Sequence, residues 1–211
     1  ISEGLVGSEM CIRDRPKLAP YQVVIIPITP NEDSSSLILE SAQKIVNEID
    51  GDFRVHIDDR DNISPGFKFN EWELKGVPLR LEIGPRDIEN NSVVFSRRDG
   101  VEGKFNVPIS EIKNKVSENL DDIHNTLLES SKIFREENTK HVENYEALIN
   151  ALNSEPGFVT CYWDENSSDE DIVKQETKAT LRCYVLDHDK TGKAVNNENS
   201  EGKLAIFSKA Y

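Results

Sequence analysis

An unbroken apolar run near the start of the chain constrains the fold most strongly. Residues 21–28, YQVVIIPI, place β-branched and apolar side chains at consecutive positions. A strand buried on both faces has this pattern, and such strands occur in parallel sheets covered by helices. Ser34 and Ser35 can cap a following helix, whose apolar positions recur at helical spacing: Ile38, Ala42, Ile45 and Ile49. With a second expected strand over residues 53–57, this order predicts an α/β fold with right-handed crossovers.

Turn signals divide the next part of the chain into short elements. Pro65 and Gly66 interrupt the chain, the residues FKFNEWELK predict about two turns of helix, and Gly76 is placed to end that helix. We expect strands over residues 79–83, 93–96 and 103–107, with a hairpin turn between the last two. The sequence therefore predicts a mixed sheet of about five strands, flanked by helices, in residues 18–110.

The spacing of apolar side chains becomes helical in the second half of the chain. Residues 108–152 carry apolar side chains at helical steps, which predicts an amphipathic helical region broken near Ser130 or Asn138. Its polar face is negative and would be repelled by anionic lipid, so we expect a connector, residues 111–152, packed on the C-terminal module. Strands and one helix, capped by Ser168, then predict a second small α/β domain in residues 153–211.

Composition excludes several classes of protein. No stretch approaches the roughly 18 apolar residues of a membrane helix, so we expect no membrane association. Three scattered cysteines, Cys11, Cys161 and Cys183, form no disulfide framework and no CxxC pair, which is typical of a reduced intracellular protein. Residues 1–17 show no periodicity and resemble translated read-through of a sequencing adapter, so we expect an unstructured or artefactual leader.

Charge is unevenly distributed along the chain. The net charge of -14 argues by itself against a nucleic-acid partner, and we expect no DNA partner. Residues 66–104, however, balance seven positive against seven negative side chains, so the acidic excess lies elsewhere. Such a segment is either a mixed, solvated surface or a site of opposed charges.

The run PGFKFNEWELKGVPLRLEIGPRD, residues 65–87, resembles prolyl-tRNA synthetases of the archaeal and eukaryotic-like type. Residues 18–110 resemble the anticodon-binding domain of class II aminoacyl-tRNA synthetases, and the ending AIFSKAY is similar to the C-terminus of the same type. The resemblance extends over nearly all of residues 18–211. It implies the C-terminal half of a proline–tRNA ligase, with tRNA(Pro) as partner.

The resemblance also implies which residues contact the anticodon, in which this family meets two consecutive guanines. The implied residues are Glu73, Arg80, Arg86, Asp87 and Lys104. A guanine offers N1–H and N2–H to a carboxylate, and O6 and N7 to a cation, so these residue types suit an unpaired base. The alternative is that Glu73, Lys75 and Arg80 form ordinary surface ion pairs, each contributing under about 1 kcal/mol.

Other side chains have weaker assignments. Lys68, Arg97 and Arg98 are either phosphate contacts or plain solvated charges, and Trp72 is better explained by core packing than by base stacking. In relatives the terminal tyrosine, here Tyr211, is implied to reach toward the catalytic site. The histidines at positions 56, 124, 141 and 188 have no metal-ligand spacing.

Many relatives carry a zinc module with four cysteines in the second domain. The resemblance places these ligand positions on Asp164, Asp169, Ala194 and Asn197, whereas Cys161 and Cys183 fall elsewhere. A tetrahedral zinc site needs four nitrogen or sulfur donors. We therefore expect no zinc and no other metal ligands.

No Gly-rich nucleotide-binding segment with its arginine occurs in the sequence, so we expect no catalytic residues and no cofactor in this chain. By resemblance, the full-length enzyme is a cytoplasmic homodimer that uses ATP and Mg²⁺, and its catalytic domain should precede residue 18. The alternative is a free-standing tRNA-binding or protein-interaction module without ligase activity.

Overall fold

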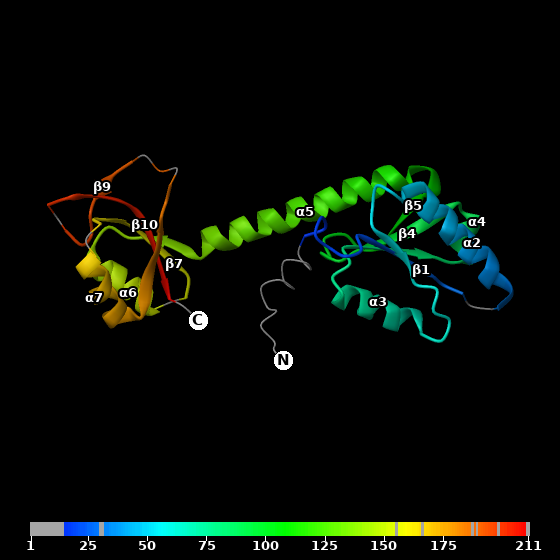
Figure 1. Cartoon of the computed structure of the whole chain (residues 1–211), viewed down its shortest axis with the longest axis horizontal. Coiled ribbons are helices and arrows are strands. Elements are labelled where there is room, and N and C mark those ends of the chain that lie inside the picture. The colour runs from blue at the N-terminus through cyan, green and yellow to red at the C-terminus, as the bar shows by residue number, and fades with distance from the viewer. Residues whose placement is uncertain are drawn as a thin grey trace. The chain divides into compact units, whose positions relative to one another are not determined.

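The computed structural model divides the chain into two compact units, Ile1–Glu129 and Ser130–Tyr211 (Figure 1). It describes residues 15–29, 32–154, 156–165, 167–186, 188, 190–197 and 199–209. Each unit has its own sheet and its own buried cluster of apolar side chains. Among the described residues, no helix has both the length and the apolar composition needed to cross a membrane.

The first unit contains the expected mixed sheet of five strands, in the order β2-β1-β3-β4-β5. The strands are β1 (Val23–Pro27), β2 (Val55–Ile57), β3 (Leu79–Ile83), β4 (Ser92–Arg97) and β5 (Phe105–Pro108). β1 pairs in parallel with both β2 and β3, whereas the β3–β4 and β4–β5 pairs are antiparallel. The α/β class and the central, fully buried position of β1 are therefore confirmed.

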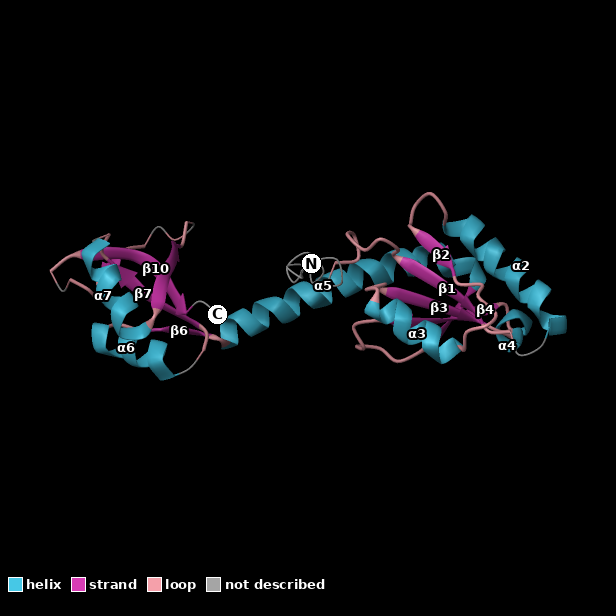
Figure 2. Ribbon diagram, turned by 60° about the horizontal axis from the view of Figure 1, so that its bottom comes forward, coloured by secondary structure: helices cyan, strands magenta, loops and turns pink. Residues whose placement is uncertain are grey.

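Helices cover both faces of this sheet (Figure 2). The main core joins the sheet to α2 (Glu32–Ile49), to the short α4 (Pro85–Glu89) and to the start of α5 (Ile112–Glu137). A smaller cluster on the other face joins β1 to α3 (Pro65–Leu74), which is capped by Ser64. Gly76 follows α3 with a φ of 80°, the left-handed conformation expected of a glycine that ends a helix.

The connecting helix corrects one expectation. Its buried residues Ile112, Val116 and Leu120 belong to the core of the first unit, not to a connector packed only on the C-terminal module. A one-turn 3-10 helix, η1 (Ile109–Glu111), leads into α5, which ends at Glu137, so the predicted break near Asn138 is confirmed. Helical periodicity shows that one face is apolar, but it does not show which core covers that face.

The second unit is built on a sheet with the order β6-β7-β10-β8, and β9 pairs with β10. Its strands are β6 (Thr139–His141), β7 (Phe158–Trp163), β8 (Ala179–Tyr184), β9 (Gly192–Lys193) and β10 (Glu201–Lys209), and its helices are α6 (Tyr145–Ser154) and α7 (Ser167–Thr177). Trp163 and Phe207 meet edge to face in its core, with ring centroids 4.8 Å apart. This is the expected small α/β unit.

Candidate nucleic-acid interface

Strand pairing brings polar side chains to the face of the first sheet that carries α3. Arg80 of β3 lies beside Val24 of β1 and Ser96 of β4, and Glu82 lies beside Ile26. Val24 and Ile26 are buried in the cluster that includes α3, so Arg80 and Glu82 share the α3 face. On this face α3 packs on β1, whereas β3 presents charged side chains.

Glu82 is the centre of the charged group on this face. Its side chain is only 5% exposed, its Oε1 accepts a hydrogen bond from Arg80 Nε at 3.1 Å, and its Oε2 accepts one from Lys104 Nζ at 2.7 Å. A buried carboxylate is stable only when it is paired in this way. Because each Glu82 oxygen already holds a cation, Glu82 positions Arg80 and Lys104.

Phe69 of α3 completes the arrangement. The guanidinium carbon of Arg80 lies 4.3 Å from the Phe69 ring centroid, and Lys104 Nζ lies 4.8 Å from it. Arg80 Nη2 also donates to Ser96 Oγ at 2.9 Å. The Arg80 cluster, defined here as Phe69, Arg80, Glu82, Ser96 and Lys104, therefore holds two cations in fixed positions.

Glu73 stands next to this cluster. It is exposed on the last turn of α3 and lines, with Arg80, Ser96 and Arg98, a small hollow of about 50 Å³. The alternative of ordinary ion pairs holds for Lys75, which pairs with Glu71 at 2.7 Å, whereas Arg80 pairs with the buried Glu82. Among the described residues, Glu73 has no ion-pair partner. A carboxylate that has no ion-pair partner in the described part of the chain, and a fixed guanidinium, thus border the same hollow.

Arg86 and Asp87 lie at another place. They belong to the first turn of α4, where Asp87 Oδ2 accepts a hydrogen bond from the Gly84 backbone N–H at 2.8 Å. Gly84 follows Arg80 by four residue positions, or about 13 Å at the rise of an extended strand. Among the described residues, no hydrogen bond or ion pair joins Arg86 or Asp87 to the Arg80 cluster. The structure therefore brings Glu73, Arg80 and Lys104 together, with Arg86 and Asp87 beyond the far end of the strand.

Two of the expected phosphate contacts are corrected by burial. Lys68 is 4% exposed and donates from Nζ to the Asp58 carbonyl oxygen at 3.0 Å. Arg97 is 7% exposed and bonds to Asp99 and Asp122, each at 2.6 Å. Neither cation is solvated or open to a phosphate. Arg98 is half-buried, donates to the Gly76 carbonyl oxygen at 3.0 Å and keeps its place beside Glu73.

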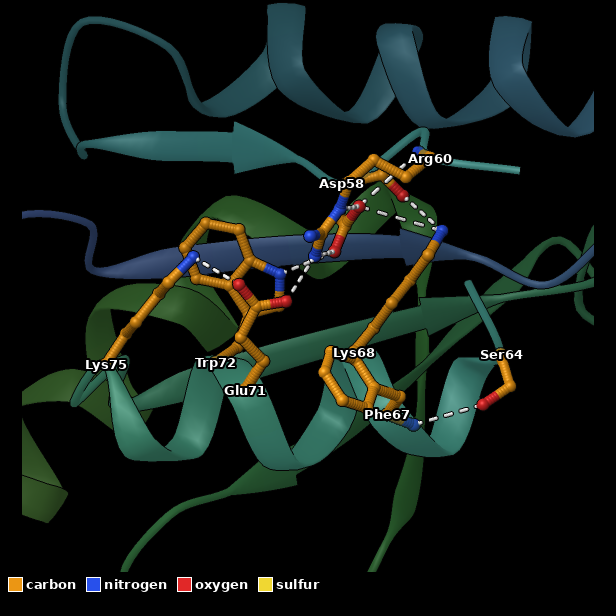
Figure 3. A network of polar contacts seen from close by, with 8 residues as sticks. All are labelled: Asp58, Arg60, Ser64, Phe67, Lys68, Glu71, Trp72 and Lys75. Carbon is orange, nitrogen blue, oxygen red and sulfur yellow. Dashed lines mark hydrogen bonds and ion pairs between the residues drawn. The ribbon is translucent and has the colours of Figure 1, made fainter. Parts of the chain in front are cut away.

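A buried network anchors α3 to the sheet (Figure 3). Asp58, 1% exposed, accepts hydrogen bonds from Trp72 Nε1 at 2.7 Å and from Arg60 Nη2 at 2.6 Å. Arg60 also donates to Glu71 at 2.6 Å. Burial alone would raise the pKa of Asp58, but the hydrogen bonds from Arg60 and Trp72 and the charge of Lys68 hold that pKa well below its usual range. Trp72 is 5% exposed, which confirms its role in the core.

The described residues of the second unit do not present a set of zinc ligands at the positions implied by the resemblance. Ala194 has no donor atom, and the Asp164 carboxylate accepts hydrogen bonds from Ser200 Oγ at 2.8 Å and from Asn197 Nδ2 at 3.2 Å. Burial raises the pKa of the Cys161 thiol to about 12, so it stays protonated at neutral pH. In the part of the chain that the structure describes, no group of three potential metal ligands is found.

Asn196, which follows β9, joins its own loop to the residue after β7 and to the first turn of α7. Its Oδ1 accepts from the Asp164 backbone N–H at 2.9 Å, and its Nδ2 donates to the Asp164 carbonyl oxygen at 3.2 Å and to Asp169 Oδ2 at 3.0 Å. Protein hydrogen bonds thus occupy the positions that the resemblance gave to metal ligands. Tyr211 and residues 1–14 lie outside the described residues.

Comparisons with known proteins match both units. A family model described as "Anticodon binding domain" matches residues 22–119, and one described as "Prolyl-tRNA synthetase, C-terminal" matches residues 145–211. The chain is 44% identical over 199 residues to a proline–tRNA ligase of Roseiflexus sp. (strain RS-1), covering 93% of this chain and 41% of that protein. It is 40% identical over 207 residues to the proline–tRNA ligase of Natranaerobius thermophilus, covering 97% of this chain and 42% of the relative.

A solved structure agrees with these matches. The crystal structure of prolyl-tRNA synthetase from Cryptosporidium parvum, complexed with L-proline and AMP, superposes with a TM-score of 0.80 at 35% identity. That superposition covers 93% of this chain and 42% of the other. The chain thus spans about two fifths of the length of the relatives that it matches.

Proposed function

The chain belongs to the prolyl-tRNA synthetase family and matches the C-terminal region of its members, so we propose that it is the part of a proline–tRNA ligase that recognises the anticodon of tRNA(Pro). The same matches favour this role over a free-standing tRNA-binding or protein-interaction module. In the whole enzyme, a class II synthetase, we propose that a separate catalytic domain joins proline to the tRNA with ATP and Mg²⁺. We also propose that the whole enzyme forms a homodimer and acts in the cytoplasm.

One observation carries this proposal: Glu73 borders the same small hollow as Arg80 and Ser96, two members of the Arg80 cluster. Glu73 offers a carboxylate to guanine N1–H and N2–H, and Arg80 keeps N–H groups for O6 or N7. The Arg80 guanidinium, whose carbon lies 4.3 Å from the Phe69 ring centroid, also offers a planar group on which an unpaired base can stack. Arg86 and Asp87, in α4 beyond the end of β3, would meet a second nucleotide.

A binding titration tests this proposal. The probe is an RNA stem-loop with a proline anticodon, compared with the same stem-loop in which adenines replace the two guanines. We expect the guanine loop to bind about 5- to 150-fold more tightly, since one base contact contributes about 1–3 kcal/mol. Affinity should fall only modestly with salt, because few phosphates are neutralised by an acidic protein. Equal affinity for the two loops at every salt concentration would contradict anticodon recognition.

We also propose that the second unit folds without zinc. The contacts of Asn196 supply the cross-link between loops that a metal would otherwise provide. A chelator should therefore leave the melting temperature unchanged, whereas Asn196→Ala should lower stability by about 1–3 kcal/mol. Asn199→Ala, in the same loop, is the matched control and should have little effect. One equivalent of zinc in the purified protein, or a lower melting temperature with chelator, would refute this proposal.

A further inference from the structure

A second pocket of the first unit lies on the other side of the α3 C-terminus from the Arg80 cluster. It has a volume of about 510 Å³, within the range of small-ligand sites. Tyr21, His56, Arg60, Trp72 and Lys75 line it, and its surface is mostly apolar. Of these five residues, only Trp72 also borders the hollow beside Glu73.

Three rings form the wall of this pocket. The His56 ring centroid lies 5.0 Å from that of Tyr21 and 4.8 Å from that of Trp72, and Tyr21 meets Trp72 edge to face at 5.9 Å. Trp72 is fixed by its hydrogen bond to Asp58, whereas Tyr21 is 39% exposed and presents its ring to solvent. The pocket therefore has a rigid base and an accessible aromatic side.

The rim of the pocket is positive although the protein is acidic. Figure 3 shows Arg60 and Lys75 converging on Glu71 beside the Trp72 ring, over which Lys75 Nζ lies at 4.3 Å. The network has three cations, Arg60, Lys68 and Lys75, against two carboxylates, Asp58 and Glu71. One positive charge is thus in excess, and Arg60 and Lys75 are 36% and 49% exposed.

The aromatic wall and the positive rim together indicate which kind of ligand the pocket can bind. A flat ring suits the aromatic wall, and an attached anion suits the cationic rim, which together describe a nucleotide of a single strand. Trp72 and Val77 line both this pocket and the hollow beside Glu73, so the two sites adjoin across the C-terminal turn of α3. One RNA loop can then reach both sites.

We propose that this pocket binds a nucleotide of the tRNA anticodon loop outside the guanine pair, by stacking its base against Tyr21. This inference rests on the proposed function. Every base has a flat face, and the rim carries no base-specific set of donors, so the pocket should contribute affinity without sequence preference.

Substitution of Tyr21 tests the pocket. With the stem-loops described above, Tyr21→Ala should weaken binding at least about fivefold, and by the same factor for the guanine and adenine loops. Tyr21→Phe keeps the ring and should bind as the unsubstituted chain does. Leu37→Ala, which removes a 55% exposed side chain of α2 on the opposite face of the sheet, should change nothing. Melting temperatures of all variants show whether the fold is intact.

A series of stem-loops with single abasic sites locates the nucleotide. We expect one loop position outside the guanine pair at which the missing base weakens binding to the unsubstituted chain but not to Tyr21→Ala.

If Tyr21→Ala binds within twofold of the unsubstituted chain while guanine preference persists, the pocket proposal is overturned and the proposed function stands. If guanine preference is absent but the Tyr21 effect persists, the pocket stands and anticodon recognition fails.

Discussion

Replacing Asp58 by alanine is expected to destabilise the first unit by about 3–5 kcal/mol, the largest single effect that the structure predicts. Asp58 is 1% exposed and holds Trp72, Arg60 and Lys68 at once. Its removal leaves the Lys68 ammonium, itself 4% exposed, in an apolar region without its counter-charge. Urea unfolding followed by circular dichroism measures the loss.

The neighbouring carboxylate provides the control. Asp59 is exposed, so Asp59→Ala removes the same charge from the same loop and should change stability by no more than about 0.5 kcal/mol. Equal effects of the two substitutions would show that the network does not anchor α3. A loss confined to Asp58→Ala would support the anchoring role.

The same residue predicts a dependence on pH. Because the folded state lowers the pKa of Asp58, its ionised carboxylate stabilises the fold above the unfolded pKa of about 3.9, and this contribution is lost as the pH falls below that value. The difference in stability between the unsubstituted chain and Asp58→Asn should therefore be constant from pH 7 to pH 5 and should shrink below about pH 4. A constant difference at all pH values would contradict the lowered pKa.

The second large effect is expected on RNA binding. The double substitution of Glu73 and Arg80 by alanine should weaken binding of the guanine stem-loop about 30-fold or more, since two base contacts of at least about 1 kcal/mol each are lost. This change removes one negative and one positive charge, so the net charge of -14 is unchanged and long-range attraction to RNA stays the same. Fluorescence anisotropy titration measures the affinity.

A second charge-neutral pair serves as the control. Lys115 and Glu118 form an exposed ion pair on α5, 2.6 Å apart. Their double substitution by alanine should leave RNA affinity within about twofold and stability within about 0.5 kcal/mol, the usual range for exposed pairs. If both double variants lose affinity equally, Glu73 and Arg80 do not form a specific site.

The fold was largely predictable because its elements are marked locally. The unbroken apolar run of β1, the stripe of α2 and the turn at Gly76 each specify their own conformation. The prediction that α5 packs on the C-terminal module was wrong, because periodicity identifies an apolar face but not the core against which that face packs. The strands β6 and β9 were missed since they are only three and two residues long.

The site was only partly predictable. Glu73, Arg80 and Lys104 follow from the resemblance, but Glu82 and Phe69, which join Arg80 to Lys104, do not. A signal for Glu82 existed, because a carboxylate within the apolar strand LRLEI must find cations on neighbouring strands. Lys68 and Arg97 were misassigned because a charged residue is normally exposed, and their buried partners Asp58 and Asp99 become visible only when the chain is folded.

The most direct test is a crystal structure of this chain bound to the proline anticodon stem-loop. We expect one unpaired guanine with its pairing edge within about 3.2 Å of the Glu73 carboxylate, and its ring stacked over the Arg80 guanidinium. A stem-loop bound on the opposite sheet face, or bound with both guanines turned away from Glu73 and Arg80, would contradict this expectation.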